Sequence, residues 1–141
     1  MKYIFSILFI VFGFNSAFAD LKKGDVISGS VWVIDGDSLI ITAKDHKKYE
    51  VRIFGINAPE LSTDKGQVAK RFMIRLIKSG NRQASCEFME YDKYKRHVAI
   101  CNNSKGDLAE IMLKNKQAWL FKRYLHKADK KIQNKYKQAV K

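Results

Sequence analysis

The sequence predicts an α+β domain, mainly β, in which five strands form a small Greek-key barrel with about three helices. Three consecutive segments rich in β-branched and aromatic residues are separated by short turn signals. A segment with helical periodicity follows, and after it come two more strand-like segments. The last part of the chain again has the spacing of helices. Strands grouped before helices are typical of the α+β class.

The first 19 residues are expected to be a cleaved signal peptide, outside the fold. Lys2 provides the positive start, residues 3–14 form an apolar run, and Ala17-Phe18-Ala19 has the small-x-small pattern that signal peptidase reads. The run is short for a membrane span, which needs about 20 residues. Cleavage after Ala19 is therefore favoured over an uncleaved anchor helix. We expect export by the Sec route to the periplasm or the outside, with no stable membrane anchor after cleavage.

Residues 20–141 are expected to form one domain with a strong positive charge. The whole chain carries a formal charge of +13, and removing the one charged residue of the leader, Lys2, leaves +12. Such an excess points to a polyanionic partner: nucleic acid, anionic lipid or a cell-surface polymer. Residues 114–141 contain ten Lys or Arg and one acid, Asp129. A solvated helix face is the simpler interpretation of that tail.

The first three strands are bounded by two plausible tight turns, at Asp35-Gly36 and at residues 44–46. The strands themselves are Val26–Ile34, Ser38–Ala43 and Tyr49–Ile56. In the third of them, Arg52 shares a face with apolar residues. A guanidinium stays protonated, so its partial burial requires an anion. That anion is either a carboxylate in a structural ion pair or a bound ligand.

The rest of the chain alternates between helix and strand. Helices are expected over Gln67–Lys78, closed by Gly80, over Asp107–Asn115, and from about Lys127 onward; the remaining strands are Ala84–Glu90 and Arg96–Cys101. Five strands with a helix after the third predict a barrel of the oligonucleotide/oligosaccharide-binding (OB) type.

The two cysteines fall on the last two strands, which are expected to form a hairpin centred between Lys93 and Tyr94. The directly opposed pairs in that register are Tyr91 with Arg96, Met89 with Val98, and Cys86 with Cys101. Opposed residues have Cα atoms within disulfide reach. Disulfides persist outside the cytosol, so a cross-strand disulfide is favoured over two free buried thiols.

Aromatic residues divide into two groups by their neighbours. Trp32, Phe72, Phe88 and Trp119 lie on apolar stripes and are expected in the core. Tyr91, Tyr94 and Tyr124 lie among Lys and Arg and are placed to stack on bases.

Oxygen and guanidinium side chains cluster at the predicted strand ends. Asp35 and Asp37 flank the first turn, Asn57 and Glu60 follow the third strand, and Arg96 ends a charged turn. Oxygen ligands suit a hard cation such as Ca²⁺. A cation, two arginines and a carboxylate that directs water are the components of a phosphodiester hydrolase.

Three motifs in this order resemble those of the staphylococcal nuclease (thermonuclease) family. They are Val33-Ile34-Asp35-Gly36-Asp37-Ser38, the segment from Arg52 to Glu60 with seven residues between them, and Asp92-Lys93-Tyr94-Lys95-Arg96. The similarity extends to Ala118-Trp119, and so covers nearly all of residues 20–141. The resemblance implies the barrel of that family, one Ca²⁺ ion, a monomer, and endonucleolytic attack of water on DNA and RNA that leaves 3′-phosphate ends.

The resemblance also implies roles for individual residues. Asp37 would bind Ca²⁺ with Asn57 and the carbonyl of Ala58; Arg52 and Arg96 would hold the phosphate, and Glu60 would act through water; Lys93, Tyr94 and Tyr124 would contact the nucleotide. Single strands are the expected substrate, with little base selectivity, because no base-reading element is recognisable.

Three positions depart from the family's pattern. Asn57 stands where the family usually has Asp, which removes one negative charge from the metal site. Lys95 and Lys116 stand where the family commonly has glycine. Two alternatives to an exported nuclease therefore stay open: a catalytically weak nucleic-acid-binding barrel, and a structural protein that binds anionic polymers.

Overall fold

The computed structural model describes residues 20–141, so the predicted leader lies outside the described residues. The strands are β1 (Val26–Val33), β2 (Ser38–Thr42), β3 (Lys48–Ile53), β4 (Ile56–Asn57), β5 (Gln83–Tyr91), β6 (His97–Asn103), β7 (Gly106–Asp107) and β8 (Trp119–Leu120). The helices are α1 (Asp64–Ser79), α2 (Leu108–Lys114), the 3₁₀ helix η1 (Lys122–Lys127) and α3 (Lys130–Ala139).

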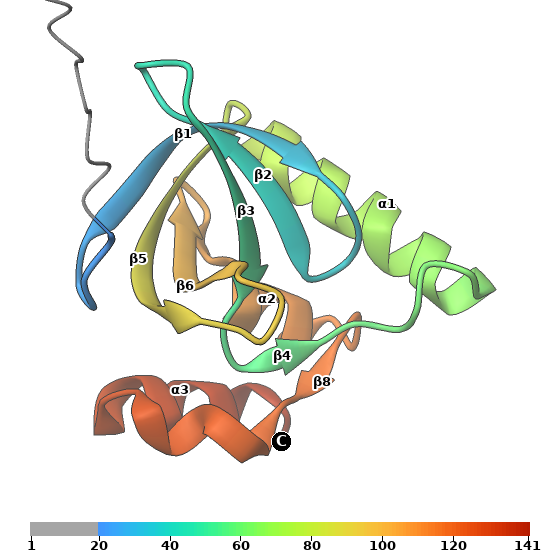
Figure 1. The fold of residues 1–141 in the computed structure, drawn as a ribbon. Coiled ribbons are helices and arrows are strands. Elements are labelled where there is room, and N and C mark those ends of the chain that lie inside the picture. Colours follow the sequence, from blue (N-terminus) through green and yellow to red (C-terminus); the bar gives the residue numbers. More distant parts are fainter. Residues whose placement is uncertain (1–19) are drawn as a thin grey trace, which may run out of the picture.

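Five strands close into a barrel (Figure 1). Strands β1, β2 and β3 form an antiparallel meander, β1 also pairs with β5, and β5 pairs with β6. A parallel pairing of β3 with β6 closes the ring, with Val51 opposite His97 and Ile53 opposite Ala99. This confirms the predicted mainly β, OB-type barrel with about three helices.

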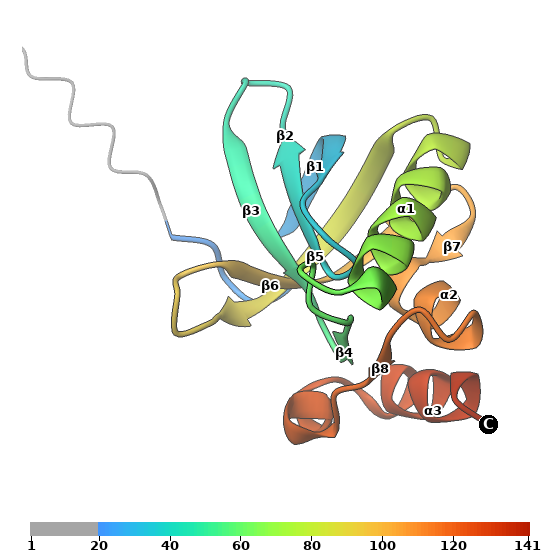
Figure 2. The ribbon, with the colours of Figure 1, turned by 90° about the vertical axis from the view of Figure 1, so that its right-hand side faces the viewer.

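The helices begin at side-chain caps that the sequence contains. Helix α1 starts at Asp64, three residues before the predicted start at Gln67, because Thr63 accepts a hydrogen bond from the Gly66 N–H at 3.0 Å. Figure 2 shows α1 on one side of the barrel and α2 and α3 at one end. Within residues 20–141, no helix combines the length and hydrophobicity that crossing a membrane requires.

Asp107 fixes the last helix to the barrel. It is 4% exposed and caps α2 by accepting from the Glu110 N–H at 3.1 Å. Its carboxylate also pairs with Lys135 at 3.0 Å and accepts from the Tyr136 hydroxyl at 3.1 Å. Burial raises the pKa of Tyr136, so the hydroxyl stays protonated and donates. Helix α3 is therefore docked through a buried, charge-assisted network.

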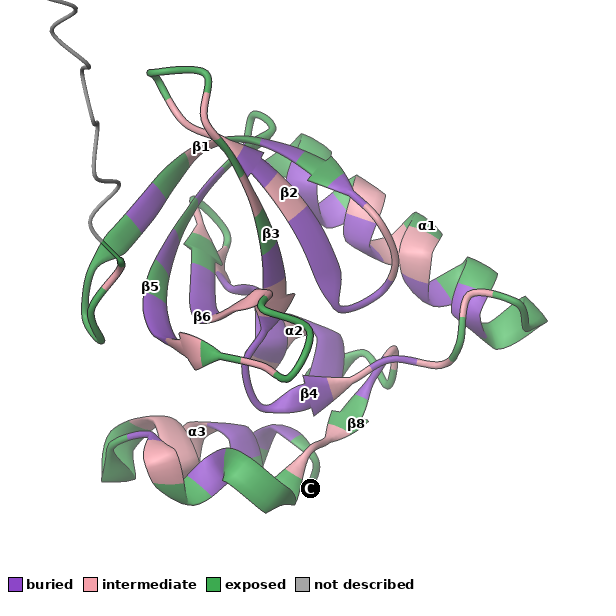
Figure 3. Ribbon diagram, viewed as in Figure 1, coloured by how far each residue is buried: buried purple, intermediate pink, exposed green. Residues whose placement is uncertain are grey.

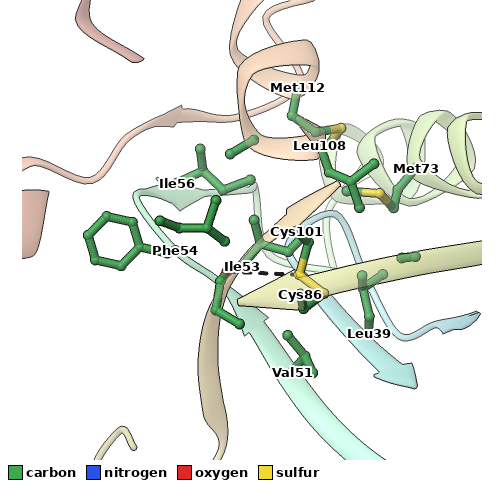
Figure 4. Close-up of a cluster of buried hydrophobic side chains, with 14 of the residues drawn as sticks. Leu39, Val51, Ile53, Phe54, Ile56, Met73, Cys86, Cys101, Leu108 and Met112 are labelled. Atoms are coloured by element: carbon green, nitrogen blue, oxygen red, sulfur yellow. Dashed lines mark hydrogen bonds between the residues drawn. A yellow bond between two sulfur atoms is a disulfide. The ribbon is translucent and has the colours of Figure 1, made fainter. Parts of the chain in front are cut away.

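The core fills the barrel and continues beneath α1 and α2 (Figure 3). Figure 4 shows side chains of β2, β3 and the segment after it meeting those of the helices, among them Leu39, Val51, Ile53, Phe54, Met73 and Leu108. Strand β3 ends at Ile53 and not at the predicted Ile56, because Gly55 adopts a φ of +80°. A Cβ there would lie 2.8 Å from the Tyr136 ring. The turn is thus closed by α3.

Two of the four aromatic residues expected in the core lie on the surface. Trp32 is 73% and Trp119 53% exposed, whereas Phe88 is buried and Phe72 half-buried. Trp32 alternates with the buried Val31 and Val33, so its side chain points to the outer face of β1. Trp119 belongs to the two-residue strand β8, opposite Asn57. The prediction that both tryptophans lie in the core is therefore wrong. Apolar neighbours in the sequence did not show that both indoles extend from outward-facing positions.

Cys86 and Cys101 form a disulfide across directly opposed positions of β5 and β6, as the hairpin register predicted. The register shifts by one residue between Phe88 and Glu90, at a β-bulge. As a result Glu90 opposes Val98 and Tyr91 opposes His97, so the predicted pairs Met89–Val98 and Tyr91–Arg96 are wrong. The shift leaves Met89 buried without a direct partner and places Arg96 in the turn.

The disulfide is expected to stabilise the fold by about 3 kcal/mol, because it closes a 15-residue loop in the unfolded chain. Reductant should lower the urea midpoint of the wild-type protein, whereas a Cys86→Ala/Cys101→Ala variant should be less stable and indifferent to reductant. Unfolding followed by circular dichroism measures both. Equal midpoints for oxidised and reduced wild type would contradict the expectation.

Candidate active site

The turn between β1 and β2 delivers a buried carboxylate. Asp37 is 8% exposed and accepts hydrogen bonds from the Ala58 N–H and, at 3.2 Å, from the Ser38 hydroxyl. Its own N–H donates to the Asp35 carboxylate at 2.9 Å, which fixes the turn. Gly36 allows the close approach, because a Cβ there would lie 2.6 Å from the Cβ of Ala58. The turn is therefore packed directly against the segment that follows β4.

Arg52 on β3 joins three segments of the chain. Its Nη2 lies 3.3 Å from Asp37 Oδ2 and donates to Asn57 Oδ1, and its Nη1 donates to the Ile53 carbonyl at 2.9 Å. The predicted structural ion pair is thus present. Arg52 is partly buried, and it also lines a cavity. The same arginine is consequently in position for both roles considered from the sequence.

Burial dominates the ionisation of this pair. It raises the pKa of Asp37, an effect that the charge of Arg52 and the hydrogen bond from Ala58 oppose. Burial also lowers the pKa of Arg52; Asp37 opposes that effect, and the positive charge of Arg96 adds to it. A guanidinium remains protonated in proteins, so the pair carries one fixed positive charge close to a second arginine.

The turn between β5 and β6 holds that second arginine. Asp92 Oδ2 accepts from Arg96 Nε at 2.7 Å, and Asp92 Oδ1 accepts from the N–H groups of Tyr94 and Arg96 at 2.8 and 3.0 Å. Partial burial alone would raise the pKa of Asp92, but these hydrogen bonds outweigh it and the pKa is lowered. Asp92 therefore has two structural roles: it fixes the backbone of the turn and it orients the Arg96 side chain.

Lys95 completes the turn in a left-handed conformation, with φ +62°. Lys116 after α2 is likewise left-handed, with φ +54°. Both are positions where the resemblance led us to expect glycine. Non-glycine residues are uncommon in this region and carry modest strain. The turn nevertheless closes, since the Lys95 N–H donates to the Asp92 carbonyl at 2.9 Å.

A cavity of about 540 Å³ separates the two arginines from the 3₁₀ helix η1. The residues predicted from the sequence that line it are Arg52, Asn57, Tyr91, Lys93, Tyr94, Arg96 and Tyr124. The Lys93 ammonium lies 4.9 Å and the Arg96 guanidinium 5.5 Å from the centre of the Tyr94 ring. The cavity thus combines cations with exposed aromatic faces, which suits a nucleotide.

Three predicted residues do not line the cavity: Asp37, Ala58 and Glu60. Asp37 and Ala58 are buried and in contact with each other. Glu60 is exposed in the loop before α1, where its carbonyl accepts from Thr63. Its carboxylate forms no hydrogen bond or ion pair with another residue among 20–141. The structure therefore brings together all the predicted oxygen and cationic groups except Glu60.

Several lining residues were not predicted. Phe121, Arg123 and Lys127 line the cavity, and Lys127 forms an ion pair with Glu90 on β5. The Lys127 ammonium also lies 4.6 Å from the centre of the Tyr124 ring. Glu90 and Lys127 are 37 positions apart, so no local pattern could pair them. The contact of Asp92 with Arg96 could have been predicted from the sequence, because the acid precedes the arginine by four residues across a turn.

Comparison with known proteins places the same part of the chain in one family. The family model described as "Staphylococcal nuclease homologue" matches residues 50–141. A Haemophilus influenzae protein named "Uncharacterized endonuclease" is 32% identical over 96 residues, covering 68% of this chain and 53% of that protein. "Probable staphylococcal-like nuclease CAN3" of Oryza sativa subsp. japonica is 36% identical over 80 residues, covering 55% of this chain.

The chain spans about half the length of the Haemophilus relative. It spans 20% of the rice relative. What the matched proteins share with this chain is thus one part of their length.

Replacing the Asp92 carboxylate by an amide is expected to destabilise the β5–β6 turn by about 1–2 kcal/mol, because the negative charge and the acceptor of the Arg96 Nε bond are lost. A carboxylate whose pKa is lowered on folding stabilises the protein above its unfolded pKa, near 3.8. That contribution is lost as the pH falls through the lower, folded-state value. The stability difference between wild type and Asp92→Asn should therefore be present at pH 6 and shrink below about pH 4. Urea unfolding at both pH values measures it. A difference independent of pH would contradict the assigned ionisation.

Proposed function

This chain belongs to the family of staphylococcal nuclease homologues, and we propose that it is an exported, Ca²⁺-dependent endonuclease. In this proposal it hydrolyses phosphodiester bonds of DNA and RNA and leaves 3′-phosphate ends. The observation that carries the proposal is one juxtaposition. Arg52 and Arg96 line the same cavity, and Arg52 contacts the oxygen side chains of Asp37 and Asn57.

The two arginines are the groups that bind the phosphodiester. A guanidinium presents paired N–H donors that match two phosphate oxygens. The charge on phosphorus grows as water attacks, so two fixed positive charges stabilise the transition state more than the substrate. Arg52 is oriented by β3 and Arg96 by Asp92. Neither side chain has to be ordered from free rotation when substrate arrives.

Glu60 is the candidate for directing the attacking water. Its carboxylate is exposed and makes no bond to another described residue, so it is free to accept a proton from water. It lies on the loop between β4 and α1, and Thr63 holds the backbone of that loop through two hydrogen bonds to the Glu60 carbonyl. In this mechanism a movement of the Glu60 side chain completes the site when substrate binds.

The oxygen groups at and beside the cavity are of the chemical types that hard cations prefer as ligands. Asp37 offers a carboxylate, Asn57 an amide oxygen and Ala58 a backbone carbonyl. No group of three or more His, Cys, Asp or Glu side chains within residues 20–141 is arranged as a metal site. A cation here would depend on amide, peptide and water oxygens. A bound Ca²⁺ would neutralise a phosphate oxygen and help to orient the substrate.

The same cavity supports a preference for unpaired nucleic acid. Tyr94 and Tyr124 offer aromatic faces, and the Lys93 ammonium lies 4.9 Å from the centre of the Tyr94 ring. Stacking is available to any base, whereas base identity is read by hydrogen bonds to base edges. We therefore propose single strands as the preferred substrate, with little base selectivity.

A catalytically weak nucleic-acid-binding barrel is the second candidate. The observation in its favour is that Arg52 engages both Asp37 and Asn57, the two side chains proposed for the cation. With Asn57 in place of an acid, the cation has one carboxylate less to compete with that guanidinium. The two candidates bind the same polyanion and differ in cleavage.

The organisation proposed around this site is a cleaved signal peptide over residues 1–19, which lie outside the described part, and a single nuclease domain over 20–141. The leader pattern supports secretion by the Sec route. A monomer is proposed by the family resemblance alone.

Incubation of single-stranded DNA with the protein is expected to give cleavage with millimolar Ca²⁺ and none with chelator. Glu60→Ala should reduce the cleavage rate by about 10²- to 10⁴-fold, the contribution of a positioned general base, and leave binding intact. Glu87→Ala, an exposed acid on β5, is the matched control and should cleave normally. Retarded but intact DNA under both conditions would support the binding barrel instead.

An Asn57→Asp variant is expected to bind Ca²⁺ more tightly, by about tenfold, because a second carboxylate joins Asp37. The measurement is the rise in melting temperature with added Ca²⁺, which needs no substrate and grows with the ratio of ligand concentration to Kd. Asn134→Asp on the exposed face of α3 adds the same charge elsewhere. A similar response from both variants would show that Asn57 does not contact the cation.

A further inference from the structure

We propose that the protein has a second surface for single-stranded nucleic acid, separate from the cavity of the candidate active site. This α1–β1 surface consists of Trp32, Arg71, Arg75, Lys78 and Arg82, all of them exposed. None of the five lines the cavity between the two arginines. In Figure 2, α1 lies on the opposite side of the barrel from the β5–β6 turn.

Three of the cations form a row along α1. Arg71, Arg75 and Lys78 are spaced four and three residues apart, so they project from one helical face. The opposite face of the helix is buried against the barrel through Ala69, Met73, Leu76 and Ile77. No carboxylate within residues 20–141 forms an ion pair with these three side chains. The only acid of α1, Asp64, is at its first position.

The turn after α1 extends the row to β1. Asn81 and Arg82 have φ values of +58° and +56°, two consecutive non-glycine residues in the left-handed region. The Arg82 N–H donates to the Ile77 carbonyl, and the Arg82 carbonyl accepts from the Val31 N–H, both at 2.9 Å. The backbone of Arg82 is thereby fixed to both elements while its side chain is exposed. A glycine would suit this conformation better, and the fold itself makes no use of the arginine.

Trp32 supplies an exposed aromatic face on β1, one residue from the backbone contact between Val31 and Arg82. It follows Val31 on β1, and β1 contacts α1. Its cross-strand partner Ile40 is itself half-buried, so the indole stays 73% exposed. On α1, Phe72 is half-buried and lies 5.6 Å from the Arg75 guanidinium. The most exposed tryptophan of the described chain thus lies on a strand that contacts the helix carrying the row of cations.

The combination selects the partner. A row of unpaired Lys and Arg fits the repeating charge of a polyanion. An exposed indole gains from stacking on a base, and an unpaired base presents its face, whereas a base inside a duplex does not. Single-stranded nucleic acid therefore uses both parts of the α1–β1 surface. The inference extends the proposed function, because a long strand held there is kept close to the cavity.

Binding tests this surface without requiring cleavage. In chelator, fluorescence anisotropy is measured with a labelled oligothymidylate of about 30 nucleotides, and with one of about 6 that spans a single site. The variant is Arg75→Gln/Lys78→Gln/Arg82→Gln. Its matched control, Lys130→Gln/Lys137→Gln/Lys141→Gln, removes the same charge from exposed positions at the C-terminal end.

The surface variant should bind the long strand about tenfold more weakly than wild type, and the control variant less than about threefold, because phosphate contacts give most of the affinity. The short strand should bind all three proteins similarly. Equal loss in the two variants would overturn the proposal and leave only a general charge effect. Since no turnover is involved, this outcome is independent of whether the protein proves to be a nuclease.

The stacking contact has its own test. The chain has two tryptophans, so Trp119→Phe leaves Trp32 as the only indole. The long oligothymidylate should then quench the tryptophan emission, and a duplex of the same length should quench it much less. Unchanged emission with the single strand, or equal quenching by the duplex, would overturn the assignment of this surface to unpaired bases.

Discussion

The site depends on one partly buried cation. Arg52 lies on β3, and its guanidinium bonds to Asp37 in the β1–β2 turn and to Asn57 in β4. A charge in this position is costly unless it is paired, so the two oxygen partners fix the relative positions of three segments that are separate in sequence. The groups proposed to bind a cation are thus also the groups that keep in place the arginine proposed to bind phosphate. The contacts of Arg52 with Asp37 and Asn57 therefore stabilise the fold and also position the groups of the proposed site.

The two arginines of the cavity are supported in different ways. Arg52 is anchored in the barrel wall, where β2 and β6 both pair with its strand. Arg96 is in a turn, held by Asp92 and by a lysine in a left-handed conformation. The disulfide between Cys86 and Cys101 joins the two strands of that hairpin on the other side of the bulge from the turn. The site therefore combines one rigid contact with one whose position depends on a short, charged turn.

The sequence predicted the barrel and most of the site because both follow from local patterns. Alternation identified the strands, and short motifs identified Asp37, Arg52, Asn57 and Arg96. Contacts between distant segments left no such signal, as the ion pair of Lys127 with Glu90 shows. The bulge at Met89 was not predicted, because one extra residue in β5 changes the pairing register of the hairpin and leaves no distinctive pattern in the sequence. Trp32 was misplaced because hydrophobicity does not reveal which face of a strand is covered.

The Lys and Arg side chains of the described chain fall into two groups, those paired with carboxylates and those that are not. Arg52, Arg96, Lys127 and Lys135 pair with carboxylates and hold parts of the fold together. The row on α1 pairs with no carboxylate of residues 20–141 and is spaced along one exposed helical face, where Arg75 lies over the Phe72 ring. Mutual repulsion makes such a row slightly unfavourable in the isolated protein. A bound polyanion would neutralise the row and replace this repulsion by attraction. Burial is the reason that Arg52 needs the anion Asp37, whereas the exposed cations of α1 are solvated and gain an anion only when a ligand binds.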